Sequence, residues 1–198
     1  MRLVQAMTMG MVLMMNLQGI QFAHARDSHQ SAPPIVQTEQ GSVEGALADG
    51  VVLFKGIPYV APPVGDLRWR EPQPAAAWDG VRKADAFGNT CLQPDIPGFE
   101  DAVDTGAQSE DCLYLNVFTA GISTTVTTTT TTATSVPKRP VMVWIHGGAF
   151  NIGSGSTDGY SGAPLVRQGV VVVTFNYRLG QLGFFAHPAL EKESPQGL

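Results

Sequence analysis

Charged side chains are scarce in this sequence: Lys, Arg, Asp and Glu together make up 15% of the 198 residues, and the net charge is −5. Soluble domains average about 25% charged residues. A chain this poor in positive charge does not favour nucleic acid or anionic lipid as a partner. The hydrophobic share of 43% and the length instead predict one folded domain with a substantial core.

Cysteine is also rare, and its placement excludes a familiar kind of metal site. The chain has two cysteines and no Cys-x-x-Cys pair, and its four histidines are scattered. Structural zinc sites draw their ligands from closely spaced Cys and His residues. We therefore expect no metal, and nothing in the sequence calls for a cofactor.

The sequence lacks an apolar run clean enough to span a bilayer well. Its most apolar segment, residues 3–22, is interrupted by Gln5, Asn16 and Gln18. Arg2 precedes this segment, and Ala23-His24-Ala25 follows it with the small-x-small pattern of a cleavage site. We predict a signal peptide over residues 1–25, cleavage after Ala25 and a secreted or periplasmic chain. A membrane anchor is the less favoured alternative.

Both cysteines, Cys91 and Cys112, lie in the segment that remains after cleavage, residues 26–198. An exported chain meets an oxidising compartment in which two cysteines tend to pair. A disulfide closing a loop of this length is worth about 3 kcal/mol in chain entropy. Two free, buried thiols are the alternative.

The patterning of the chain predicts both strands and helices. Short strands joined by turns are expected over residues 35–54, with a hairpin at Asp49-Gly50, and a further strand over residues 113–118. Two continuous apolar runs, residues 140–145 and 169–175, indicate strands buried on both faces. A weakly helical stretch separates them, which is the order expected of a parallel strand pair.

Two segments have little regular structure to predict. Nine of the thirteen residues at positions 123–135 are Thr, and this run has almost no apolar partner to pack against. We interpret it as a flexible surface loop between two strands. Residues 176–198 are expected to be rich in loops.

The motif that points most directly to chemistry is His146-Gly147-Gly148-Ala149-Phe150, which follows the first buried strand. Ester hydrolysis passes through a tetrahedral intermediate with a negative oxygen, and backbone N–H groups aimed at that oxygen stabilise it. Glycine allows the sharp turn and the close approach that such a loop needs. Ala149 retains its N–H and is small, so the loop can keep this role. A simple glycine-rich turn is the structural alternative.

Other blocks along the chain place this loop in a known context. Over residues 36–198 the sequence resembles the type-B carboxylesterases. The resemblance rests on five blocks in family order: Phe54-Lys55-Gly56-Ile57-Pro58-Tyr59, Pro62-Pro63-Val64-Gly65-Asp66-Leu67-Arg68-Trp69, Ser109-Glu110-Asp111-Cys112-Leu113-Tyr114-Leu115-Asn116-Val117, the strand with its glycine motif at residues 141–150, and Asn176-Tyr177-Arg178-Leu179-Gly180.

The resemblance implies a fold: the N-terminal part of an α/β-hydrolase, with a small antiparallel N-terminal sheet and the first strands of a mixed, mostly parallel main sheet. It also implies roles in the glycine motif. Gly148 and Ala149 match the positions whose N–H groups form the oxyanion hole, and Gly147 shapes the loop. Phe150 and Asn151 are candidates to line the substrate pocket.

The same resemblance implies two structural pairs. Cys91 and Cys112 match the first disulfide of the family, in agreement with the argument from cysteine count. Arg68 and Glu110 match an ion pair beside that disulfide. We expect this ion pair to be buried, in which case removing one partner would be costly.

The catalytic residues of such an enzyme are missing from these 198 residues. The family places its nucleophile in a Gly-x-Ser-x-Gly elbow, and no such motif occurs. The segment at residues 153–157 comes nearest, with Gly155 where Ser belongs and Thr157 in the final Gly position. The acid and the base of the triad lie later in the family, so we assign His146 to the loop rather than to catalysis.

These observations predict a secreted serine esterase that acts on a small-molecule carboxylic ester through an acyl-enzyme. This chain would supply the oxyanion hole and would be inactive alone. The alternative is a non-catalytic, secreted binding protein of the same fold.

We predict that residues 26–198, expressed alone, aggregate or remain partly molten. A sheet without its later strands exposes apolar faces and an open edge. Thermal unfolding and analytical ultracentrifugation test this expectation, which a sharp cooperative melt of a monomer would contradict.

Overall fold

The computed structural model describes residues 33–95, 97, 106–121 and 138–193. The predicted signal peptide and the threonine-rich segment lie outside these described residues. None of the helices in the described part of the chain has the length and apolar character needed to cross a bilayer.

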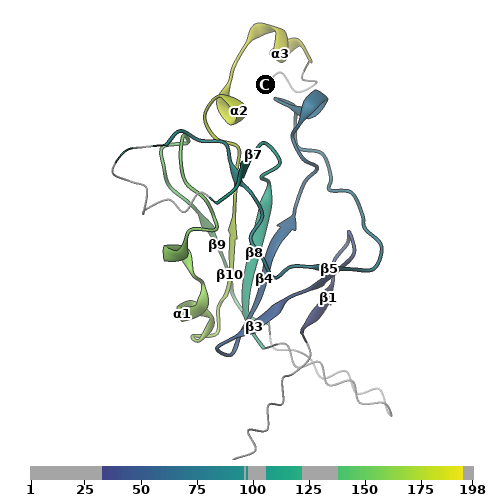
Figure 1. Cartoon of the computed structure of the whole chain (residues 1–198), viewed down its shortest axis with the longest axis vertical. Helices are drawn as coiled ribbons and strands as arrows, with labels where there is room; N and C mark the ends of the chain where they lie inside the picture. Colours follow the sequence, from purple (N-terminus) through teal and green to yellow (C-terminus); the bar gives the residue numbers. More distant parts are fainter. Residues whose placement is uncertain (1–32, 96, 98–105, 122–137, 194–198) are drawn as a thin grey trace, which may run out of the picture. The chain divides into compact units, whose positions relative to one another are not determined.

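A five-stranded mixed sheet forms the centre of the described fold, with the strand order β3-β4-β8-β10-β9 (Figure 1). Its strands are β3 (Ala46–Ala48), β4 (Val51–Pro58), β8 (Tyr114–Ala120), β9 (Val141–Ile145) and β10 (Val171–Phe175). The pairs β3–β4, β4–β8 and β8–β10 are antiparallel, and β9–β10 is parallel. The predicted mixed sheet is therefore present, although antiparallel pairs dominate this part of it.

Two smaller sheets accompany the main one. The first joins β1 (Ile35–Gln37), β2 (Ser42–Glu44) and β5 (Val81–Lys83). Its β1–β2 pair is antiparallel, as predicted for a small N-terminal sheet, but β5 joins β2 in parallel. The second pairs β6 (Thr90–Cys91) with β7 (Gln108–Ser109).

Local sequence explains two of the connections in the main sheet. Asp49 and Gly50 form the two-residue turn between β3 and β4, and both have positive φ angles, 50° and 77°. This is the backbone of a type I′ hairpin turn, which Asp-Gly favours. Between β9 and β10 the chain forms the short helix α1 (Ala163–Val166), and the two strands align from Val141 opposite Val171. The predicted strand–helix–strand unit is thus confirmed.

Helix α1 packs its buried residue Val166 against the sheet. Val166 forms a core cluster with Val51 of β4, Phe118 of β8 and Val172 of β10. Gly162, just before α1, leaves no room for a side chain, since a Cβ there would lie 2.7 Å from the Val172 side chain. α1 thus covers residues of β4, β8 and β10 in the middle of the sheet.

The segment after β10 differs from the prediction that it would be mainly loop. It contains α2 (Gly180–Phe184) and α3 (Pro188–Glu193). Both are short, and glycines at positions 180 and 183 hide α2 from a propensity argument. Two 3₁₀ turns, at Gly65–Leu67 and Asp158–Tyr160, complete the described helical structure.

Strand β9 does not have the two buried faces that its apolar sequence predicted. All five of its residues are exposed, with Val143 at 56% and Ile145 at 66%. Strand side chains point to the faces of a sheet, and α1 covers residues of β4, β8 and β10 but none of β9, which is the last strand of the sheet order. By contrast, β10 lies between two strands and buries Val172 and Thr174. The open apolar edge agrees with the expectation that the sheet would expose apolar surface.

Tyr59, just beyond β4, ties this strand to the end of β10. Its hydroxyl donates to the main-chain oxygen of Asn176 at 2.6 Å, and its ring meets that of Phe175 edge to face, with centroids 6.1 Å apart. Burial raises the pKa of Tyr59 to about 12.

We predict that Tyr59 makes stability fall at alkaline pH. Its folded pKa lies above the ordinary value of 10.0, so the stability that it contributes is complete below pH 10 and is lost as the pH rises toward 12. Tyrosinate absorbance and far-UV circular dichroism follow the transition. In Tyr59→Phe, the tyrosinate signal near pH 12 should be smaller and the coupled loss of structure weaker. An unchanged alkaline transition would contradict this assignment.

Candidate functional site

The glycine motif folds into a tight loop directly after β9, and we refer to residues 146–153 as the glycine loop. Three consecutive residues in it have left-handed backbones: Gly148, Ala149 and Phe150, with φ angles of 115°, 51° and 63°. Such angles are strained for residues with a side chain and cost roughly 1–3 kcal/mol each. Backbones of this kind are concentrated at functional sites, which marks the loop as a candidate site.

In the first part of the glycine loop the carbonyl acceptors are used in hydrogen bonds, whereas N–H donors are left unused. Each carbonyl oxygen from His146 to Phe150 accepts a hydrogen bond. The carbonyl of His146 accepts from Tyr177 Oη, and that of Gly147 accepts from His146 Nδ1. The carbonyl of Gly148 accepts from the N–H groups of Asn151 and Ile152, that of Ala149 from Asn151 Nδ2, and that of Phe150 from the N–H of Gly180. In contrast, the N–H groups of Gly148 and Ala149 donate to no acceptor in the described part of the chain. The N–H groups of Gly147 and Phe150 have no acceptor there either, so the two donors that the resemblance assigns lie within a run of four available backbone donors.

Steric contacts show which glycine the loop requires. A Cβ added to Gly148 would lie 1.9 Å from the carbonyl oxygen of Ile152, whereas one added to Gly147 would meet open space. Gly147 also has no positive φ. The tight turn thus depends on Gly148, and the role predicted for Gly147 has no steric counterpart here.

His146 is buried at the base of the loop, with 3% of its surface exposed. Its ring stacks on Tyr177 with centroids 4.3 Å apart. Nδ1 lies 2.8 Å from the carbonyl of Gly147, which can only accept, so Nδ1 carries the proton of the neutral ring. Burial lowers the pKa of His146, against a smaller opposite effect of this hydrogen bond. The ring is a structural support of the loop in its neutral form.

The segment that most resembled a nucleophile elbow, residues 153–157, is the return of the loop into the fold. Ser154 is completely buried, and its hydroxyl lies 2.5 Å from that of Ser156 and 3.2 Å from Asn176 Oδ1. Gly155 packs so closely that a Cβ would lie 2.7 Å from the main-chain nitrogen of Phe175. A hydroxyl with no exposed surface cannot attack a substrate, so the rejection of this segment as a nucleophile stands.

Asn176, at the end of β10, holds this return in place. Its Oδ1 accepts from the N–H of Gly155 at 2.8 Å, and its Nδ2 donates to the carbonyl oxygens of Asn89 and Cys112 at 3.0 and 3.1 Å. The side chain is buried, and every donor and acceptor of its amide is used. Satisfied buried amides of this kind make a structure rigid.

The two residues proposed to line a substrate pocket lie on the outer side of the loop. Phe150 is 60% exposed, and its ring meets Phe184 of α2 with centroids 4.8 Å apart. Asn151 donates from Nδ2 to the carbonyl oxygen of Ala149 at 3.0 Å. Phe150 thus offers apolar surface beside the two free N–H groups, and Asn151 stabilises the strained turn.

The two cysteines form a disulfide, with Cys91 and Cys112 both buried in a cluster with Leu113 and Leu179. The alternative of two free thiols is therefore excluded. The bridge joins β6 to the segment that leads into β8, and the carbonyl oxygen of Cys112 accepts a hydrogen bond from Asn176, the residue after β10.

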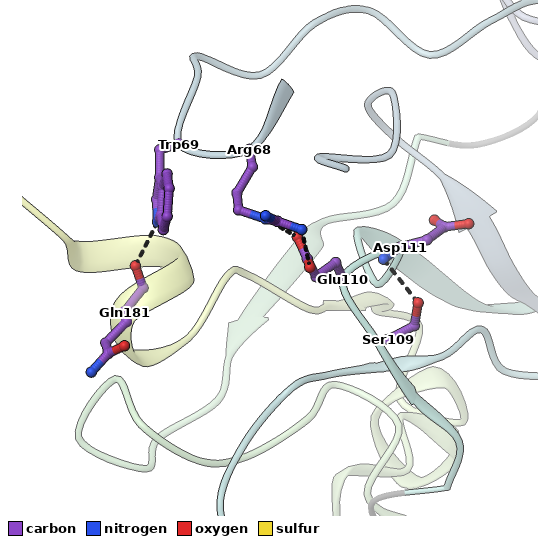
Figure 2. A network of polar contacts seen from close by, with 6 residues as sticks. All are labelled: Arg68, Trp69, Ser109, Glu110, Asp111 and Gln181. Atoms are coloured by element: carbon purple, nitrogen blue, oxygen red, sulfur yellow. Dashed lines mark hydrogen bonds and ion pairs between the residues drawn. The ribbon is translucent and has the colours of Figure 1, made fainter. Parts of the chain in front are cut away.

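Arg68 and Glu110 form an ion pair through two hydrogen bonds of 2.6 Å each (Figure 2). These bonds lower the pKa of the Glu110 carboxyl. The expectation of a buried pair is wrong: the two side chains are 40% and 22% exposed. Solvent screens a pair at the surface, so its loss costs less than that of a buried pair. The neighbouring Trp69 turns the other way and donates to the carbonyl of Gln181 in α2.

Sequence reasoning assigned no role to Gln93, Asn176 or Tyr177, which all contact the glycine loop or its return. Asn176 and Tyr177 belong to a block that carried the family resemblance, so a signal was present without an explanation. Gln93 lies 60 residues before Gly153, its partner in the loop. No local pattern connects residues so far apart.

The mixed sheet, the parallel strand–helix–strand unit and the glycine loop at the end of β9 define an α/β-hydrolase-type protein. A sequence model of the carboxylesterase family matches residues 32–195. The chain belongs to this carboxylesterase family.

Individual relatives support this membership. The chain is 45% identical to a fumonisin B1 esterase of Sphingopyxis macrogoltabida over 84% of its own length, and 46% identical to a para-nitrobenzyl esterase of Bacillus subtilis over 76%. It covers 28% of each of these relatives. A solved structure of a PNB esterase has a TM-score of 0.68 and 42% identity, over 80% of this chain and 30% of that one.

We predict opposite outcomes for alanine at the two adjacent glycines. The background is a chimera in which residues 33–193 replace the matching segment of the Bacillus subtilis relative. Gly148→Ala should lower the free energy of unfolding by about 2–4 kcal/mol, because its Cβ meets the Ile152 carbonyl at a positive φ. Gly147→Ala, the matched control, should change it by less than about 0.5 kcal/mol. Urea denaturation measures both, and equal effects would contradict the loop geometry.

Proposed function

We propose that this chain forms the oxyanion-hole part of a secreted serine esterase, which hydrolyses small-molecule carboxylic esters through an acyl-enzyme. The observation that carries the proposal is the free N–H groups of Gly148 and Ala149, in a strained loop whose carbonyls from His146 to Phe150 all accept hydrogen bonds. Donors that are fixed before the reaction stabilise a developing oxyanion at no cost of reorganisation.

The burial of His146 supports this assignment. A neutral ring with 3% exposure, stacked on Tyr177 and bonded to the Gly147 carbonyl, holds the loop and takes no part in proton transfer to a substrate. General base catalysis needs a side chain within reach of the reacting group. The base must therefore be supplied by another residue.

Residues 1–198 contain no complete Gly-x-Ser-x-Gly motif: Ser154 is buried, and the exposed Ser161, in Gly159-Tyr160-Ser161-Gly162-Ala163, has Ala163 where the motif requires Gly. We infer that these residues have no esterase activity alone, because an oxyanion hole without a nucleophile gives only residual catalysis. The relatives are named for the hydrolysis of fumonisin B1 and para-nitrobenzyl esters. This supports a carboxylic ester as the substrate class here.

Export is part of the same proposal. A signal-peptide pattern over residues 1–25 and the Cys91–Cys112 disulfide both suit an oxidising compartment. Amino-terminal sequencing of the exported product tests cleavage after Ala25.

The chimera with the Bacillus subtilis relative tests the catalytic role. It should hydrolyse p-nitrophenyl acetate, and replacement of Ala149 by lactic acid, which exchanges the N–H for an ester oxygen and still allows the φ of 51°, should lower kcat by about 10²- to 10³-fold. Ala149→Gly keeps the N–H and relieves the positive φ, so it is the matched control and should retain activity. Equal activity of all three proteins would contradict an oxyanion hole at this position.

The DNA beyond codon 198 separates the esterase from a binding protein of the same fold. A reading frame that continues into Gly-x-Ser-x-Gly supports the enzyme. A stop codon, together with an expressed and stable short protein, supports the non-catalytic alternative.

A further inference from the structure

We propose that Gln93 is a positioning residue for the oxyanion hole: its side-chain amide clamps the backbone of Gly153 and thereby fixes the glycine loop. The inference rests on the proposed function, since it concerns how the free N–H groups of Gly148 and Ala149 are held. No motif of the sequence includes Gln93 in that site.

The clamp has two points of contact with one residue. Gln93 Oε1 accepts from the N–H of Gly153 at 2.7 Å, and Gln93 Nε2 donates to the carbonyl oxygen of Gly153 at 3.0 Å. Asn and Gln are the neutral side chains that offer both a carbonyl and an NH₂ group, and Asn is one methylene shorter. The side chain thus bonds both the N–H and the carbonyl of Gly153, as a paired β-strand would. It fixes both the position and the orientation of that residue.

Gly153, the last residue of the glycine loop, lies directly against the first two, His146 and Gly147. A Cβ added to it would stand 2.4 Å from Nδ1 of His146 and 2.6 Å from the carbonyl oxygen of Gly147, and its φ is 113°. His146 and Gly147 immediately precede the two free donors. A displacement of Gly153 therefore moves His146 and Gly147, and the peptide groups that follow them.

Gln93 is itself firmly held, so the clamp has a fixed origin. Its main-chain N–H donates to Oε1 of Gln108 at 2.9 Å, and its Nε2 also donates to the carbonyl oxygen of Cys91 at 3.1 Å. Cys91 is buried and bonded to Cys112. The disulfide cluster thus anchors one end of the clamp, and the glycine loop receives the other.

The opposite side of the loop has an independent tie. The hydroxyl of Tyr177 donates to the carbonyl oxygen of His146 at 2.6 Å. Two ties from different elements hold the base of the loop between them. Removal of Gln93 should therefore shift the free N–H groups without unfolding the loop, because the Tyr177 tie remains.

The first experiment compares Gln93→Ala with Gln73→Ala in the chimera. Gln73 is the matched control, because its Nε2 bonds only the nearby Glu71 carbonyl at the surface. We expect Gln93→Ala to lower kcat by about 10- to 100-fold with little change in KM, since the donors serve the transition state and a small misplacement is costly. Gln73→Ala should change neither constant.

Gln93→Glu separates the two contacts. A carboxylate accepts from the N–H of Gly153, but its second oxygen would repel the carbonyl oxygens of Gly153 and Cys91, so kcat should fall at least as far as in Gln93→Ala. A carboxylate that restored full activity would show that the donor contact is dispensable and would overturn the two-point clamp.

A second measurement needs no catalysis. In the isotope-labelled chimera, Gln93→Ala should shift the amide signals of Gly148 and Ala149 and speed hydrogen exchange at Gly153, while Gln73→Ala should leave all three unchanged. A lower melting temperature with unchanged kcat and unchanged Gly148 and Ala149 signals would mean a merely structural tie and would overturn the proposal. A chimera without esterase activity refutes the proposed function instead, and the amide signals then still decide whether Gln93 holds the loop.

Discussion

The buried amide of Asn176 is the interaction on which the arrangement of the site depends. Its side chain bonds the return of the glycine loop at Gly155 and the carbonyl of Cys112 beside the disulfide. Its main-chain oxygen accepts from Tyr59 at the end of β4. Three segments that are distant in sequence are thus bonded to Asn176, the residue that follows β10. With all its partners present, the buried group makes the end of the sheet rigid instead of costing stability.

This rigidity explains how the strained glycine loop persists. Ala149 and Phe150 adopt left-handed angles that an isolated chain would avoid. The surrounding contacts compensate: Asn151 bonds the Ala149 carbonyl, and the N–H of Gly180 bonds the Phe150 carbonyl at 2.7 Å. The loop therefore uses the acceptors of residues 146–150 for stability and leaves the N–H groups of residues 147–150, Gly148 and Ala149 among them, without an acceptor in the described part of the chain. That division of labour is what a site for a developing negative charge requires.

The middle strands of the sheet hold the buried core, whereas the end strand β9 is exposed. Val51 of β4, Phe118 of β8 and Val172 of β10 are buried against Val166 of α1, which covers one face of the sheet there. Strand β9 has a partner on one side only, and its apolar side chains are in solvent. The strand that carries the glycine loop is thus the least covered strand of the sheet. The loop owes its order to the ties behind it, from Asn176, Tyr177 and Gln93, and not to cover over β9.

Sequence alone determined what depends on neighbouring residues. Asp49-Gly50 specifies a hairpin turn, apolar runs specify β9 and β10, and the spacing of glycines in residues 146–150 identifies a loop with free backbone donors. Tertiary structure decided what depends on distant partners. The ion pair of Arg68 and Glu110 is exposed, neither face of β9 is buried, and Gln93 contacts Gly153, which lies 60 residues further along the chain. Burial and long-range contacts follow from how strands are ordered in the sheet, and no local pattern records that order.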